Sequence, residues 1–167
     1  MALDNPADLF LYELSGAYDA ERKSNQMVGE ILGMTEHSPL AQILRAQQQQ
    51  GQQKIQNVET CFAMMETEPV EVPCLAVDGM RAEFQAFAGH GPSMEAMEIY
   101  TVDMESRLAH FGIAAYQALI DKALLMGEVQ CAQILRTNLV QKQENAGTFE
   151  RIGHELSQRV SMAPMGV

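Results

Sequence analysis

The 167-residue sequence has no tryptophan, only three cysteines, and no apolar run near the roughly 20 residues that a membrane-spanning helix requires. Cys61, Cys74 and Cys131 are widely spaced and form no Cys-x-x-Cys pair, so we expect buried, reduced thiols without a redox role. The N-terminus lacks a basic segment followed by an apolar one, so no signal peptide is expected. These features predict a cytoplasmic protein.

Basic residues are also scarce, with 11 Lys and Arg against 22 Asp and Glu and a formal net charge of −11. Because nucleic acids and anionic membranes would repel such a surface, neither is an expected partner. Hydrophobic residues make up 47% of the chain, which is typical of a folded protein. We therefore expect an acidic protein with a single globular domain over residues 1–167.

Proline and glycine divide the chain into segments with helical periodicity and almost no strand signal. Helices are predicted over about 6–32, 38–66, 74–88, 93–126 and 128–159, followed by a frayed tail at 161–167. Short turns join the first two helices and the last two, and the long middle connection contains the short helix. This pattern predicts an all-α, ferritin-like four-helix bundle with a short extra helix in the crossover.

Three of the long helices become polar at mid-length, on the face that the periodicity predicts to be buried. This expected polar core layer consists of Glu21, Gln48, Gln49, Gln52, Asn138, Gln141, Lys142 and Asn145. Buried polar groups cost free energy unless they bond to one another or hold an ion. The layer is therefore a hydrogen-bonded spacer, a metal site or a pocket for a small ligand.

A dinuclear metal site in a helical bundle needs glutamates from two helices and Glu-x-x-His from the other two. This chain contains no Glu-x-x-His, because the residues three positions before its histidines are Met34, Phe87, Arg107 and Arg151. Neutral glutamine replaces an anionic ligand poorly. The sequence thus favours a structural polar layer over a metal centre.

Four stretches together resemble the YciE/YciF-like branch of the ferritin-like superfamily, which contains bacterial stress-associated proteins. They are residues 8–10 with 14–21, 74–80 with Glu83, 110–116, and 135–139 with the polar run that follows. The resemblance covers about residues 3–160. It implies a ferritin-like bundle and a role in stress.

The resemblance also implies where metal ligands would stand. The carboxylate of the first helix matches Glu21. The family's Glu-x-x-His, Glu-x-x-Glu and acidic pair fall, in that order, on Gln49 and Gln52, Ala109 and Gly112, and Gln141 and Lys142. Because the chain departs from the family at nearly every ligand position, we expect no metal and no other cofactor.

Glu21, if buried alone, would require a proton or a nearby cation. Lys142 stands where the family has a metal ligand, so its ammonium is one candidate for that cation. The alternative is a Lys142 side chain that extends to solvent. The sequence leaves both arrangements open.

Three functions follow. The first is a non-catalytic, stress-related bundle with a degenerate metal site, present as a homodimer or larger homo-oligomer. The second is an iron or manganese oxidase or peroxidase whose ligands come from Glu21, Glu98, Glu105 and His110. The third is a structural or self-assembly module with the glutamine-rich face of the second helix as its contact surface.

Overall fold

The computed structural model describes residues 3–162, and five helices account for most of them. They are α1 (Pro6–Met34), α2 (Leu40–Met64), α3 (Leu75–Ala88), α4 (Met94–Leu125) and α5 (Val129–Met162). The predicted all-α class is confirmed. Ser161 and Met162 continue α5, so the predicted start of the frayed tail is wrong, and 163–167 lie outside the described residues.

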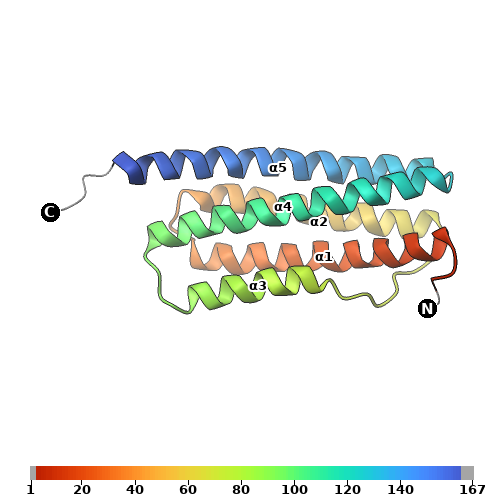
Figure 1. Ribbon diagram of the computed structural model, residues 1–167, viewed down its shortest axis with the longest axis horizontal. Coiled ribbons are helices and arrows are strands. Elements are labelled where there is room, and N and C mark those ends of the chain that lie inside the picture. The colour runs from red at the N-terminus through yellow and green to blue at the C-terminus, as the bar shows by residue number, and fades with distance from the viewer. Residues whose placement is uncertain (1–2, 163–167) are drawn as a thin grey trace.

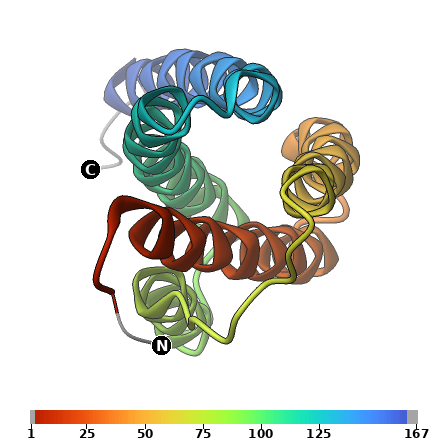
Figure 2. The same ribbon diagram turned by 90° about the vertical axis from the view of Figure 1, so that its right-hand side faces the viewer.

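The four long helices run side by side along the length of the molecule (Figure 1). α1 and α2 form one antiparallel hairpin and α4 and α5 form another, while α2 also packs on α5 and α1 on α4. Residues 65–93 cross from one end of the bundle to the other and contain α3, which packs outside α1 and α4 (Figure 2). The predicted bundle with one long crossover is confirmed, and ferritin-like folds share this connectivity.

Side-chain caps explain where two of the helices begin. The Asn5 side chain accepts a hydrogen bond from the Asp8 N–H, and Pro6 occupies the first turn of α1. Ser93 caps α4 in the same way by accepting from the Ala96 N–H. Gly127, with a φ of 82°, provides the left-handed turn between α4 and α5.

The apolar core consists of two clusters at different levels of the bundle. One includes Met27, Ile31, Leu44, Met104 and Phe149, together with Val77 and Phe84 of α3. The other includes Phe10, Leu14, Phe62, Leu119 and Leu135. Each fully buried side chain of this size stabilises the fold by about 1.5–3 kcal/mol. The residues that separate the two clusters are polar, and they form the candidate site.

Candidate functional site

A charged side chain from each of the four long helices is buried between the two apolar clusters. Glu21 of α1, Lys54 of α2, Glu105 of α4 and Lys142 of α5 are 4%, 2%, 0% and 7% exposed, respectively. We refer to these four residues as the charge cluster. Since buried ions are costly without partners, their mutual arrangement decides what the site can do.

Glu21 and Lys142 form an ion pair in the interior. The Lys142 Nζ lies 3.0 Å from Glu21 Oε1 and 3.1 Å from Oε2. The Tyr116 hydroxyl donates a further hydrogen bond of 2.9 Å to Oε1. Burial and the Glu21 charge raise the pKa of Tyr116 well above its ordinary value, so this phenol remains a donor. Both Glu21 oxygens thus accept hydrogen bonds from buried donors, one of them a charged ammonium.

Asn138 connects this pair to α2. Its side-chain N–H groups donate to the Tyr116 hydroxyl at 3.0 Å and to the Lys54 carbonyl at 3.1 Å. Its oxygen accepts a hydrogen bond of 2.7 Å from Asn57. The asparagine therefore links α2, α4 and α5 at one level of the bundle.

Glu105 and Lys54 form the less fully bonded half of the charge cluster. Gln47 donates a 2.6 Å hydrogen bond to Glu105 Oε2, whereas buried Oε1 has no hydrogen-bond partner among the described residues. Burial raises the pKa of Glu105 to about 7, although Gln47 and the two lysines oppose this shift. Burial and the charge of Lys142 lower the pKa of Lys54 to about 8. These two groups therefore titrate near neutral pH.

Two glycines make room for the buried polar side chains. A Cβ at Gly112 would lie only 2.8 Å from Lys142 Cε and 2.9 Å from its Cδ. A Cβ at Gly51 would overlap the side-chain amide of Asn25. The stem of Lys142 therefore crosses the α4 backbone where only glycine fits, and this path brings its ammonium to Glu21.

The predicted polar layer is wrong at Gln49 and Gln52, which are both exposed. In this part of α2, Gly51 and Lys54 are buried and Gln47 is half-buried, so the face predicted to point inward was displaced around the helix. A run of glutamines offers no apolar contrast from which to choose a face. Lys54 was missed, although it lies four residues before buried Val58 and seven before buried Cys61.

The remaining members of the predicted layer occupy different positions. Glu21, Asn138 and Lys142 lie together at the centre. Gln48 is half-buried with its amide nitrogen against Gly29 of α1, and Asn145 is also half-buried. Gln141 has a buried amide oxygen for which the described residues supply no hydrogen bond. The layer is thus smaller than predicted and contains more charge.

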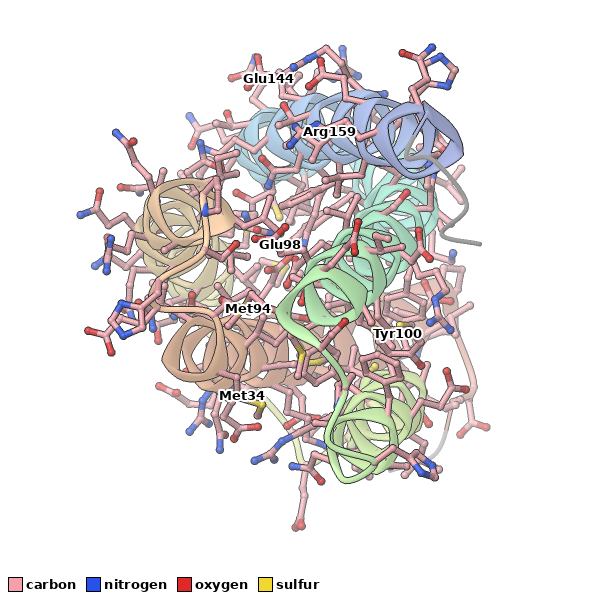
Figure 3. The ribbon with its side chains drawn as sticks, turned by 90° about the vertical axis from the view of Figure 1, so that its left-hand side faces the viewer. Met34, Met94, Glu98, Tyr100, Glu144 and Arg159 are labelled. Atoms are coloured by element: carbon pink, nitrogen blue, oxygen red, sulfur yellow. The ribbon has the colours of Figure 1, made fainter. Side chains whose placement is uncertain are left out.

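The alternative ligand set of Glu21, Glu98, Glu105 and His110 does not form one site. Glu98, on α4 near the end viewed in Figure 3, accepts a 2.6 Å hydrogen bond from Ser38. It precedes Glu105 by seven residues, about 10 Å along a helix. His110 is exposed and pairs with Glu150 at 2.7 Å. The structure therefore contradicts this set.

A dinuclear metal centre does not fit the charge cluster. The Lys142 ammonium contacts both Glu21 oxygens, and Gly112 offers no side chain at all. Within residues 3–162, no group of three or more His, Cys, Asp or Glu side chains is placed to hold a metal ion. The buried carboxylates of this site accept hydrogen bonds from ammonium, phenol and amide donors.

The fold and the site define a class: an all-α helical bundle with a buried charge cluster at mid-length. Residues 5–161 match the family described as "Domain of unknown function (DUF892)", and the chain belongs to that family. Over the part of the chain that the structure describes, no helix is both long enough and apolar enough to cross a membrane.

Known relatives support this fold and family. Protein YciF of Escherichia coli (strain K12) is 20% identical over 133 residues, which cover 79% of this chain and 80% of YciF. The crystal structure of the E. coli stress protein YciF superposes with a TM-score of 0.88 at 17% identity, covering 93% of this chain and 99% of that one. YcfI of Rhodopseudomonas palustris, described as a candidate structural protein, gives 0.84 at 24% identity, covering 90% and 97%. The resemblance to YciF-like proteins is confirmed.

Proposed function

We propose that this chain is a non-catalytic, stress-related bundle in which lysine ammonium groups replace a degenerate metal centre. The observation that carries the proposal is the Lys142 Nζ at 3.0 Å from Glu21 Oε1 in the middle of the bundle. The descriptions of two relatives, a stress protein and a candidate structural protein, support it. The chain's role would then be mechanical or binding rather than chemical.

The chemistry of ammonium explains why such a replacement removes catalysis. Metal ions in helical bundles neutralise several carboxylates and keep positions open for substrate. Lys54 and Lys142 supply two positive charges for the carboxylates of Glu21 and Glu105 when all four are ionised. An ammonium donates three hydrogen bonds but has no vacant coordination position and no redox chemistry. It can therefore hold the helices together without activating oxygen or peroxide.

We further propose a cytoplasmic, cofactor-free protein that associates with copies of itself. The exposed side chains of Gln49, Gln52, Gln53 and Gln56 give α2 a wide amide surface without formal charge, which is unusual on so acidic a chain. Sizing the native particle tests this expectation. A discrete dimer supports simple self-association, a large polymer favours an assembly module, and a monomer at all concentrations contradicts both.

Metal content tests the proposed function. The chain is produced in medium supplemented with iron and manganese, purified without chelators, and analysed by inductively coupled plasma mass spectrometry. We expect far less than one metal ion per chain in the wild type, in Glu21→Ala and in Glu36→Ala, whose side chain is exposed in the α1–α2 turn. Near-stoichiometric iron or manganese that disappears in Glu21→Ala and persists in Glu36→Ala would refute the proposal.

A further inference from the structure

Two cysteines that are 70 residues apart in the sequence meet inside the bundle. Cys61 lies in the last turn of α2 and Cys131 in the first turn of α5. The Cys61 thiol donates to the backbone oxygen of Cys131 at 3.7 Å, and the two residues are 0% and 1% exposed. Cys74, in contrast, is half-buried at the start of α3.

We propose that Cys61 and Cys131 are a redox-active dithiol that a peroxide-class oxidant converts into a disulfide joining α2 to α5. This dithiol lies within the second apolar cluster, among side chains such as Val58 and Leu135. It uses none of the charge-cluster residues. The inference therefore stands independently of the proposed function.

The surroundings assign different roles to the two sulfurs. The neighbouring Cys61 side chain lowers the pKa of Cys131, whereas Cys131 and burial raise the pKa of Cys61. Cys131 also lies in the first turn of a helix, where free N–H groups favour a thiolate. Burial and, to a smaller extent, the negative charge of Glu128 oppose this lowering of the Cys131 pKa. Cys131 is accordingly the attacking sulfur, and Cys61 resolves the intermediate.

The chemistry balances with hydrogen peroxide as the oxidant. The Cys131 thiolate attacks one peroxide oxygen, so that an S–O bond forms, the O–O bond breaks and the leaving hydroxide becomes water on protonation. The Cys61 sulfur then attacks the Cys131 sulfenic acid, an S–S bond forms, and the S–O bond breaks. The Cys61 proton leaves with the departing oxygen as a second water. Two electrons pass from the sulfurs to the peroxide.

A pocket lies at the same end of the bundle, and two of its lining residues are near the cysteines in the sequence. It measures about 620 Å³, and its lining includes Phe10, Met65 and Glu128. Met65 lies one turn beyond Cys61, and Glu128 lies three residues before Cys131. Figure 2 faces this end of the bundle, where the α4–α5 turn and the end of α2 both lie. The pocket therefore brings solvent to residues that neighbour both cysteines in the chain.

Peptide mapping of the oxidised protein tests the proposal. The folded, reduced wild type is treated with hydrogen peroxide, blocked with an alkylating agent, digested without reductant and analysed by mass spectrometry. We expect a peptide cross-linked through Cys61 and Cys131, and a fall from three free thiols to one. Cys74→Ala should give the same cross-link. Cys61→Ala should instead retain a sulfenic acid at Cys131 that a dimedone probe captures.

Two outcomes would overturn the proposal. One is oxidation confined to Cys74, seen as disulfide-linked dimers that Cys74→Ala abolishes. The other is a Cys61–Cys131 cross-link that forms only after the chain is unfolded in urea. Both are read from the wild type and from Cys74→Ala, so the result does not depend on the stability of variants in the buried pair.

Discussion

At the scale of single residues, the path of Lys142 determines the character of the site. The side chain lies across the backbone at Gly112 and ends on both oxygens of Glu21. The sequence was compatible both with this arrangement and with a lysine that extends to solvent. The structure shows the buried pair, because α4 offers an open path at a position without a side chain.

Gly112→Ala should destabilise the protein. The added Cβ would meet three carbons of the Lys142 side chain at 2.8–3.2 Å, so the lysine cannot relieve the clash by moving its tip alone. We expect a loss of about 1–3 kcal/mol in the free energy of unfolding, measured by urea denaturation. Gly147→Ala is the matched control, since nothing lies within 4 Å of its Cβ. That change should stabilise α5 by about 0.5–1 kcal/mol, and an equal gain for Gly112→Ala would refute the clash.

Glu105 should make stability fall as the pH rises towards neutrality. Its folded-state pKa of about 7 lies above the ordinary 4.5, so between these values the folded state binds more protons than the unfolded state. The free energy of unfolding should therefore fall by up to about 1.4 kcal/mol per pH unit over this range. Glu105 faces Gln47 and Lys54 of α2 and Lys142 of α5, and these three groups limit the effect.

Urea denaturation of Glu105→Gln between pH 4.5 and 7 checks this prediction. The variant should lose the downward slope and gain stability relative to the wild type as the pH rises. Glu144→Gln, on the exposed face of α5, should keep the wild-type slope. Parallel curves for wild type and Glu105→Gln would show that the carboxyl group does not titrate in this range. Lys54, with a lowered pKa of about 8, should add a rise in stability above that pH.

The sequence predicted the identity of some site residues and missed others for a definite reason. Glu21 and Asn138 interrupt clear apolar stripes, so their inward direction followed from periodicity, whereas the direction of the Lys142 side chain stayed open. Gln49 and Gln52 were misplaced because their neighbours are also glutamines. Lys142 and Glu21 are 121 residues apart in the chain. Their pairing depends on the distance between α1 and α5, and no local sequence pattern specifies that distance.

At the scale of helices, the boundaries followed from local chemistry. The predicted helix bounds lie within three residues of the observed ones, and Asn5, Ser93 and Gly127 stand at three of these ends. Short turns between long helices implied antiparallel neighbours, which the α1–α2 and α4–α5 hairpins confirm. The position of α3 outside α1 and α4 did not follow from the sequence, because its few inward residues fit several surfaces.

A buried aromatic side chain and partly exposed ion pairs hold α3 against the bundle. Phe84 is 2% exposed, and its ring centroid lies 5.9 Å from that of Tyr100, which faces α3 in Figure 3. Ion pairs link Lys23 with Asp78 at 2.6 Å and Arg107 with Glu83 at 2.8 Å. Partly exposed pairs of this kind contribute below about 1 kcal/mol each. The burial of Phe84 therefore contributes more to the docking of α3 than either of these ion pairs.

Phe84→Ala should release α3 while the bundle stays folded. Removing a buried phenylalanine costs about 3–5 kcal/mol, and α3 has few other buried side chains to compensate. We expect faster amide hydrogen exchange in residues 75–88, with little change in the centres of α1, α2, α4 and α5. The exposed neighbour change Gln85→Ala should leave exchange unaltered. A uniform acceleration across the chain would instead make α3 part of one cooperative unit.

At the scale of the whole molecule, the acidic chain keeps its two buried lysines inside and its net charge of −11 mainly on the surface. The predicted bundle is confirmed as a fold shared with YciF. Self-association and cytoplasmic location stay predictions. One claim is central at every scale: ammonium groups stabilise the middle of the bundle by neutralising its buried carboxylates.

A double-mutant cycle between Glu21 and Lys142 tests that claim most directly. The free energies of unfolding of wild type, Glu21→Gln, Lys142→Met and the double variant give the coupling between the two side chains. Glu13 and Lys122 form the matched surface pair, at 2.8 Å with both side chains partly exposed. We predict a coupling of about 3 kcal/mol for the buried pair and below about 1 kcal/mol for the surface pair. Additive effects at Glu21 and Lys142, within about 0.5 kcal/mol, would contradict the account.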